Sequence, residues 1–272
     1  LRPGFKLLGL FSLLAGLISC THYSVQSDSE VPESVSPAPK SKSIAVRQDQ
    51  PESDPLAKFV QSKIDGLSIE EKVGQLLVVG FSGKSLNSKT RALLEKIKPG
   101  SVILFSRNIG SYRQVRSFTD QLQEMSNKYS GLPLFVMIDQ EGGVVTRVKV
   151  GTSLPSALAL AQTRHPQFVR SYSMTMGLLL NRLGINMNLA PVLDVSDPHS
   201  ASFIGSRSFG EFPDDVSQLG AAFALGQWDA GVVPTAKHFP GHGGLRADSH
   251  KETPKKLYTL EELLERDVKP FK

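Results

Sequence analysis

One stretch of the sequence concentrates side chains that could do chemistry. Residues 237–254 read Lys-His-Phe-Pro-Gly-His-Gly-Gly-Leu-Arg-Ala-Asp-Ser-His-Lys-Glu-Thr-Pro and include three histidines, two acidic residues and three glycines. The glycines disfavour a regular helix or strand, and the apolar, β-branched residues 232–236 before them predict a buried strand. A polar, glycine-rich loop at the end of a buried strand is where a (β/α) barrel carries its catalytic groups.

Polar side chains also follow two earlier predicted strands. The candidates are Asp139, Gln140, Glu141 and Arg147 after the apolar run 134–138, Asn188 and Asp194 within and after the run 185–190, and Lys237 and His238 after 232–236. Each residue alone could simply cap an element or pair with an ion. Their recurrence at the same end of successive strands favours one shared site.

Three reaction classes could use these residues. Metal-dependent hydrolysis would use His238, His242, His250 and Asp248 as ligands. His238 and His242 are four residues apart, as in the helical histidine pair of zinc proteases, but Pro240 and the glycines make a helix there implausible. We therefore expect no metal and no other cofactor. Serine hydrolysis is disfavoured because a Gly-x-Ser-x-Gly elbow does not occur. Glycoside cleavage remains, and it needs a proton donor and an opposed carboxylate.

Apolar runs alternate with amphipathic segments from residue 54 onward. The runs predict five buried strands, at 76–81, 102–105, 134–138, 185–190 and 232–236, with helices before, between and after them. Near-continuous apolar strands are typical of a parallel sheet covered on both faces. Such an α/β fold is either a barrel or an open doubly wound sheet. The first strand is not followed by a glycine-rich dinucleotide fingerprint, which disfavours the doubly wound sheet.

Capping residues mark several helix boundaries. Asp54-Pro55 predicts the start of a first helix that Gly66 ends, and Ser68 with Glu71 predicts a capping box for a second. Thr259 with Glu262 predicts the last helix in the same way. Apolar residues at helical spacing predict further helices near 89–98, 115–125, 168–183 and 216–228.

The first 53 residues predict a leader and a tether rather than a folded domain. Arg2 and Lys6 precede an apolar run, 7–18, that is too short to span a bilayer. Leu-Ile-Ser-Cys at 17–20 resembles a bacterial lipobox, so we expect residues 1–20 to be a lipoprotein signal peptide and Cys20 to carry lipid; an ordinary secretory signal is the alternative. Residues 21–53 are rich in Ser and Pro and predict a flexible tether. The expected location is therefore extracytoplasmic, in the cell envelope, anchored to a bacterial membrane.

Composition and charge limit the core, the partners and the disulfides that we expect. The apolar fraction is 40%, enough for a sizeable core, and the formal net charge is +5. Lysines and arginines are scattered among acidic residues rather than collected in one stripe, so we expect no nucleic-acid binding. Cys20 is the single cysteine, which excludes an internal disulfide.

Three segments together resemble a known family. Lys237–Pro254, Asp139–Gly143 and Ile204–Phe209 are similar to the β-N-acetylglucosaminidase branch of glycoside hydrolase family 3, and the likeness runs from about Ile69 to the end of the sequence. The resemblance implies a (β/α)8 TIM barrel and a retaining mechanism without metal. It also implies a carbohydrate substrate, namely terminal β-linked N-acetylglucosamine from peptidoglycan-derived or related glycosides.

The resemblance also assigns a role to five residues. It implies that Asp139, Arg147, Arg207, Lys237 and His238 bind the sugar.

The proton donor implied by the resemblance is a histidine. His250, paired with Asp248, would be the general acid/base on a mobile loop. The chemistry fits, because histidine titrates near neutral pH and a neighbouring carboxylate orients its ring.

One expected residue does not occur in the sequence. The family's nucleophilic aspartate lies at a later strand end, whereas Asp267 falls in a predicted helix. Only five of the eight strands of a barrel are predicted, so we expect residues 54–272 to be an incomplete TIM barrel, truncated after about five strands, with its first and fifth strands as bare edges. This chain alone is then expected to be inactive. The alternative is a non-catalytic, membrane-anchored lipoprotein that binds sugar or cell wall.

Overall fold

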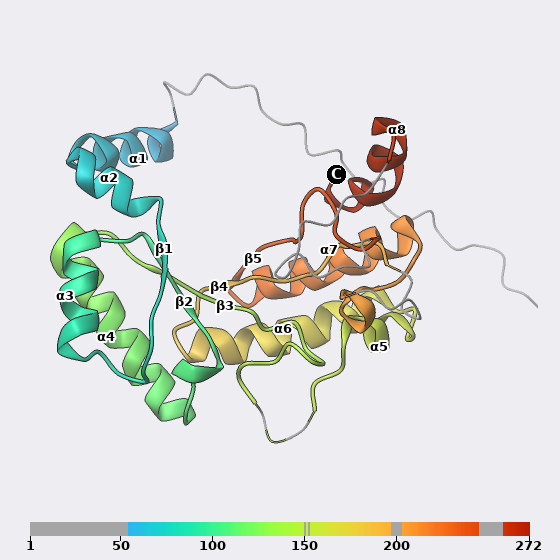
Figure 1. The fold of residues 1–272 in the computed structure, drawn as a ribbon, viewed down its shortest axis with the longest axis horizontal. Helices are drawn as coiled ribbons and strands as arrows, with labels where there is room; N and C mark the ends of the chain where they lie inside the picture. The colour runs from blue at the N-terminus through green and yellow to red at the C-terminus, as the bar shows by residue number, and fades with distance from the viewer. Residues whose placement is uncertain (1–53, 150, 152, 197–202, 245–257) are drawn as a thin grey trace, which may run out of the picture. The chain divides into compact units, whose positions relative to one another are not determined.

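The computed structural model describes residues 54–149, 151, 153–196, 203–244 and 258–272. Its centre is a parallel sheet of five strands (Figure 1). The strands are β1 (Val78–Gly80), β2 (Ser101–Leu104), β3 (Phe135–Ile138), β4 (Met187–Asn188) and β5 (Val233–Pro234). All five lie within the predicted runs or one residue from them.

The order of the strands distinguishes the two α/β folds that the sequence allowed. The strands lie side by side as β1-β2-β3-β4-β5, each parallel to the next. In a doubly wound sheet the order in which strands are added reverses at a switch point, so the spatial order of its strands is not the chain order. Consecutive strands of a (β/α)8 barrel do follow the chain order. The prediction of a barrel-type sheet is therefore confirmed, as is the prediction that the first and fifth strands lie at its edges.

Helices connect and flank the strands. They are α1 (Pro55–Asp65), α2 (Ile69–Gln75), α3 (Ser88–Ile97), α4 (Tyr112–Ser130), α5 (Ala157–Ala161), α6 (Pro166–Arg182), α7 (Pro213–Asp229) and α8 (Leu260–Glu262), with a π-helical turn at Leu263–Asp267 and 3₁₀ turns at Ser106–Asn108, Gly205–Arg207 and Lys269–Phe271. The predicted caps are confirmed: Asp54 accepts from the backbone of Leu56, and capping boxes start α2 and α8. Only α5 was not predicted.

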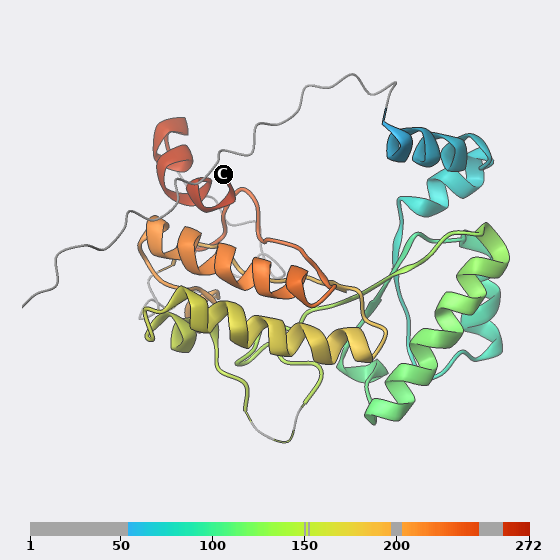
Figure 2. The same cartoon turned by 180° about the vertical axis from the view of Figure 1, so that it is seen from behind.

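The core has two parts. One lies among β1–β3, α3 and α4, with Phe118, Leu122 and Val136 almost completely buried. The other lies among α5, α6 and α7, where Val169 and Phe223 are buried. The helices α6 and α7 run side by side, as both ribbon views show (Figures 1 and 2). The strand ends that carry the candidate site are thus held by packed helices.

The prediction that the first strand is buried was wrong. Leu76 is 83% exposed, Leu77 43% and Val78 52%, although Phe81 just beyond β1 is buried. The reason is that β1 is an edge strand with β2 as its only strand neighbour among the described residues. An apolar run shows that a strand prefers burial but does not show whether a neighbour covers it.

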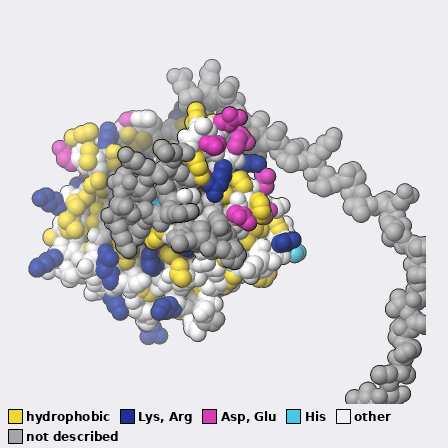
Figure 3. All heavy atoms as spheres, turned by 45° about the vertical axis from the view of Figure 1, so that its right-hand side comes forward, with side chains coloured by type: hydrophobic (Ala, Val, Ile, Leu, Met, Phe, Trp, Pro, Cys, Tyr) yellow, Lys and Arg dark blue, Asp and Glu magenta, His cyan; other side chains and the backbone are white. Residues whose placement is uncertain are grey.

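The surface carries mixed charge. On the face drawn in Figure 3, lysine and arginine side chains are dispersed among hydrophobic and neutral groups. Within the described residues, no helix is both long enough and apolar enough to span a bilayer. The predicted leader, the tether and Cys20 lie outside the described residues.

Candidate active site

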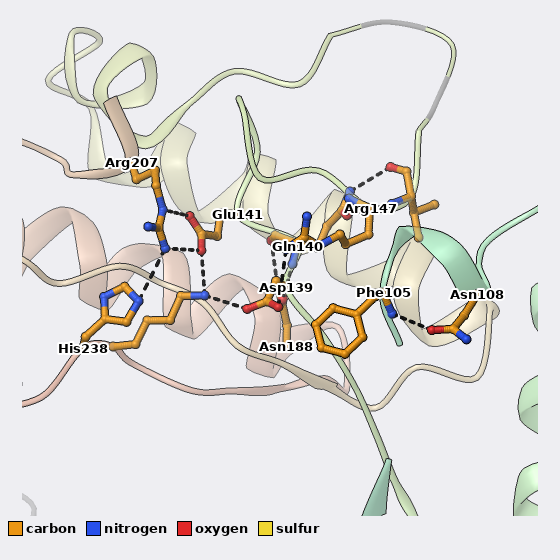
Figure 4. A network of polar contacts seen from close by, with 11 residues as sticks. Phe105, Asn108, Asp139, Gln140, Glu141, Arg147, Asn188, Arg207 and His238 are labelled. Carbon is orange, nitrogen blue, oxygen red and sulfur yellow. Dashed lines mark hydrogen bonds and ion pairs between the residues drawn. The ribbon is translucent and has the colours of Figure 1, made fainter. Parts of the chain in front are cut away.

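The candidate residues meet where parallel strands end. Asp139 directly follows β3, Asp194 lies beyond β4, and Lys237 follows β5. Carboxyl ends of neighbouring parallel strands share one edge of a sheet, so residues far apart in the chain come together there. Figure 4 shows the resulting polar network.

Lys237 lies between two carboxylates. Its Nζ is 2.8 Å from Oδ1 of Asp139 and 2.6 Å from Oε1 of Glu141. All three side chains are largely buried, with exposed fractions of 15%, 17% and 5% in that order. Hydrogen bonds to charged partners are stronger than those between neutral groups, so the ammonium group is firmly held.

Arg207 adds a second cation to Glu141. Its Nε and Nη2 donate to Oε2 and Oε1 of Glu141 at 2.8 and 2.9 Å, a bidentate pair. Burial would lower the pKa of the guanidinium, but the hydrogen bonds and charge of Glu141, with the charges of Asp194 and Asp139, outweigh it and raise the pKa above its ordinary value. The guanidinium also lies 5.1 Å from the centre of the Phe203 ring. Arg207 is therefore a fixed positive group at the edge of the network.

His238 is oriented by a buried acid. Its Nδ1 lies 2.5 Å from Oδ2 of Asp194, whose side chain is 0% exposed, and the other oxygen of Asp194 accepts from the backbone N–H of His242 at 2.5 Å. An ionised carboxylate only accepts hydrogen bonds, so Nδ1 of His238 carries the proton. Its Nε2 is then free to accept from Nη2 of Arg207, 3.4 Å away.

The loop after β3 is tied to the next strand. The side chain of Asn188 accepts from the backbone N–H of Gln140 and donates to its carbonyl, at 2.9 Å each. The buried Gln140 side chain in turn accepts from the backbone of Arg147 and Val148. This arrangement places Nη2 of Arg147 3.7 Å from Oδ2 of Asp139. Nε of Arg147 is buried and has no hydrogen-bond partner among the described residues.

A glycine turn lets this loop pack closely. Gly142 has φ of +94°, which L side chains rarely adopt, and a Cβ there would lie 2.2 Å from the carbonyl oxygen of Pro155. A glycine at position 142 is thus required by the path of the chain.

The structure brings together all five predicted sugar-binding residues, namely Asp139, Arg147, Arg207, Lys237 and His238. The predicted acid/base residues, His250 and Asp248, lie outside the described residues. No group of three potential metal ligands occurs in the described part of the chain.

Sequence reasoning gave no specific role to two acids of the network, Glu141 and Asp194. Both follow predicted strands, which is the signal that could have singled them out. Their function depends on contacts with Arg207, Lys237 and His238, which no spacing in the sequence reveals.

The arrangement suits a neutral, polyhydroxylated ligand. It presents buried donors and acceptors at one strand edge, and these can replace the water around sugar hydroxyls. The three acids of the network, Asp139, Glu141 and Asp194, are paired with cations or with His238.

Comparison with a known family gives an extensive match. The sequence model described as "Glycosyl hydrolase family 3 N terminal domain" matches residues 68–272. The beta-hexosaminidase LpqI of Mycobacterium tuberculosis is 34% identical over 274 residues, covering 98% of this chain and 65% of that protein. A beta-hexosaminidase of Alkalilimnicola ehrlichii is 38% identical over 203 residues, covering 72% of this chain and 57% of its own length. The chain thus spans about three fifths of these relatives.

Solved structures resemble the same part of the chain. A glycoside hydrolase family 3 β-N-acetylglucosaminidase from Paenibacillus sp. str. FPU-7 superposes with a TM-score of 0.72 at 37% identity, over 76% of this chain and 39% of that one. Native NagZ from Neisseria gonorrhoeae superposes with a TM-score of 0.65 at 29% identity, over 72% and 58%. Sequence and fold therefore agree on one family.

Proposed function

The chain belongs to glycosyl hydrolase family 3, and from this premise we propose that it forms the sugar-binding part of a β-N-acetylglucosaminidase. The proposed reaction is retaining hydrolysis of terminal β-linked N-acetylglucosamine. The proposed substrates are peptidoglycan-derived or related glycosides. The relatives named beta-hexosaminidase and β-N-acetylglucosaminidase support this substrate class.

The observation that carries the proposal is the polar network around Lys237. Lys237, Arg207 and the partly exposed guanidinium of Arg147 are donors, and Asp139 is an acceptor, all at one strand edge. A sugar hydroxyl both donates and accepts a hydrogen bond, so it can insert between Asp139 and a cationic side chain. Each such charge-assisted hydrogen bond is worth about 1.5–3 kcal/mol.

The proposed proton transfer uses His250, steadied by Asp248. His250 protonates the departing glycosidic oxygen and later takes a proton from the attacking water, as retaining hydrolysis requires of its acid/base. The same mechanism needs a carboxylate nucleophile. The resemblance to the family assigns Asp139 to sugar binding, and Glu141 and Asp194 are engaged with cations and with His238, so we propose that the nucleophile is a different carboxylate, one that the family contributes from a later strand end.

The test compares three proteins, namely the protein from the complete reading frame, its His250→Ala variant and the 272-residue chain. Protein expressed from the complete reading frame is expected to release the chromophore from a chromogenic β-N-acetylglucosaminide, and His250→Ala is expected to lose at least about 100-fold in kcat, the usual scale of general acid–base catalysis. The 272-residue chain is expected to bind N-acetylglucosamine without turnover. Full activity of His250→Ala would refute the assignment of the acid/base.

Turnover distinguishes hydrolysis from the alternative function, a non-catalytic sugar-binding lipoprotein. Both functions predict saturable binding of N-acetylglucosamine that Asp139→Ala weakens. Only the hydrolase predicts turnover by the protein from the complete reading frame. Absence of both binding and turnover would refute both functions.

We also propose that Cys20 is lipidated and anchors the protein to a bacterial membrane outside the cytoplasm. The lipobox-like residues 17–20 support this proposal. Metabolic labelling with a radioactive fatty acid is expected to mark the wild-type protein and not Cys20→Ser. Equal labelling of both proteins would refute it.

A further inference from the structure

Glu141 holds its cations more closely than Asp139 does, because both Glu141 oxygens lie within 2.9 Å of Lys237 or Arg207, whereas Oδ2 of Asp139 is 3.7 Å from Arg147. Oε1 accepts a hydrogen bond from Nη2 of Arg207 at 2.9 Å and forms an ion pair with Nζ of Lys237 at 2.6 Å, and Oε2 accepts from Nε of Arg207 at 2.8 Å. Its side chain is 5% exposed. These contacts fill three of the roughly four acceptor positions of a carboxylate, and because the side chain is almost completely buried, little of it can reach a ligand.

The backbone that presents Glu141 is itself fixed. The N–H of Glu141 donates to the carbonyl of Val145 at 3.0 Å, and the N–H of Gly143 donates to that of Leu154 at 3.0 Å. These backbone hydrogen bonds, with the burial of the side chain, limit how far the carboxylate can move with Lys237 or Arg207. The position of the carboxylate therefore sets the distance between the two cations.

Glu141 also brings the formal net charge of the network to zero. The charged members are three acids, Asp139, Glu141 and Asp194, and three bases, Arg147, Arg207 and Lys237. With a neutral His238 these six formal charges sum to zero. Replacing Glu141 with a neutral residue would leave one positive charge in a largely buried site, where screening by water is weak.

We propose that Glu141 is a positioning and specificity-determining residue: it sets the separation of the Lys237 and Arg207 donors and cancels their charge, so that the site accepts neutral sugar hydroxyls and excludes anions. The sugar part of this inference rests on the proposed function. The exclusion of anions does not, because it follows from the ion pairs alone.

The first test replaces Glu141 with its neutral isostere. Binding of N-acetylglucosamine and of inorganic phosphate to the 272-residue chain is measured by calorimetry. Glu141→Gln is expected to weaken sugar binding at least about tenfold, equivalent to about 1.4 kcal/mol, and to strengthen phosphate binding by at least about tenfold. If Glu141 had only a structural role, Glu141→Gln would weaken the binding of both ligands or of neither.

A charge-restoring variant checks the cause. In Glu141→Gln combined with Lys237→Met, the formal charge of the network returns to zero, so the gain in phosphate binding is expected to disappear. Phosphate binding as strong as in the single variant would overturn the proposed role of charge.

A charge-conserving variant tests position. Glu141→Asp keeps the charge but shortens the side chain by one methylene, so it is expected to weaken sugar binding while phosphate remains excluded. Wild-type sugar affinity in Glu141→Asp would overturn the positioning role. Because this variant retains an anion between the two cations, it also provides a test if Glu141→Gln does not fold, as judged by circular dichroism.

Failure of this inference differs from failure of the proposed function. If the wild-type chain does not bind N-acetylglucosamine, the proposed function fails, and phosphate binding by Glu141→Gln still decides whether Glu141 excludes anions. If the wild-type chain binds the sugar and Glu141→Gln binds both ligands as the wild type does, the inference about Glu141 fails alone.

Discussion

At the residue scale, Asp194 shows how one buried acid can fix a histidine and a loop together. One oxygen accepts from Nδ1 of His238 and the other from the backbone of His242, and the carboxylate is fully buried. Removing an acceptor here would leave a buried donor without a partner, which costs more than one hydrogen bond contributes.

Asp194→Asn is expected to weaken sugar binding and stability together. The amide offers one acceptor where two donors need one each, so either the N–H of His242 loses its partner or His238 must change tautomer. In the second case Nε2 of His238 carries a hydrogen toward Nη2 of Arg207, which is itself a donor. The free energy of unfolding in urea should fall by about 1–3 kcal/mol, and the affinity for N-acetylglucosamine should fall in calorimetry.

The control for this substitution is an exposed acid. Asp120 pairs with Arg116 on the surface of α4, with exposed fractions of 47% and 52%. Asp120→Asn should change the free energy of unfolding by no more than about 0.5 kcal/mol. Equal effects of the two substitutions would show that burial of Asp194 has no special role.

Tyr172 gives a second prediction at this scale. Its hydroxyl is buried without a hydrogen-bond partner among the described residues, and burial raises its pKa to about 12. Tyr172→Phe should therefore leave the free energy of unfolding unchanged or raise it by up to about 1 kcal/mol. The matched control is Tyr129→Phe, expected to destabilise by about 1 kcal/mol, because the Tyr129 hydroxyl donates to the carbonyl of Pro99 at 3.2 Å.

The same tyrosine predicts a dependence on alkaline pH. Since the folded state raises the pKa of Tyr172, its ionisation is easier in the unfolded chain. The contribution of neutral Tyr172 to the free energy of unfolding should be fully present below pH 10.0, the ordinary pKa of tyrosine. It should be lost progressively as the pH rises to about 12. Burial also raises the pKa of Tyr129, so Tyr172→Phe should reduce this slope in urea unfolding rather than abolish it. An unchanged slope would contradict the role given to Tyr172.

At the element scale, the close pairing of α6 and α7 depends on small residues. A Cβ on Gly226 of α7 would lie 2.2 Å from the carbonyl oxygen of Arg170 in α6. Nearby, the buried Gln227 donates to the carbonyl of Ser173, which also lies in α6. The helices therefore approach backbone to backbone, and α7 also contacts β5, the strand that Lys237 follows.

Gly226→Ala is expected to destabilise the chain by about 1–3 kcal/mol through overpacking. This loss should exceed the gain in helix propensity of about 1 kcal/mol that alanine brings. Gly66→Ala is the control, because its φ is −75° and the nearest atoms would lie 3.6 Å from the new Cβ. Thermal unfolding should show a lower midpoint for Gly226→Ala and not for Gly66→Ala, and the reverse order would refute the proposed contact.

The sequence predicted most elements because their signals are local. Capping boxes at Ser68 and Thr259 fix helix starts within four residues of chain, and apolar runs locate the strands. The bridging role of Glu141 could not be predicted, because Arg207 lies 66 residues away and the contact exists only after the strands align. The exposure of β1 was missed for the same reason: burial depends on neighbours that a run of residues does not specify.

At the scale of the whole molecule, a group of apolar side chains is left exposed around the sheet edge. It comprises Leu56, Phe59, Val60 and Ile64 on α1, Ile69 and Val73 on α2, and Leu76, Leu77 and Val78 leading into β1. An unpaired edge strand with apolar neighbours favours pairing with another chain. The 272-residue chain is therefore expected to self-associate as its concentration rises.

Val78→Lys should reduce this association, because a charge on an edge strand opposes strand pairing. The matched control is Val144→Lys, since Val144 is 77% exposed against 52% for Val78 but lies in the loop after β3, and both changes add one positive charge. Sedimentation velocity over a range of concentrations should show weaker association for Val78→Lys and wild-type association for Val144→Lys. Equal reduction in both variants would indicate a general charge effect, and a wild-type chain that stays monomeric throughout would contradict the role given to the β1 edge.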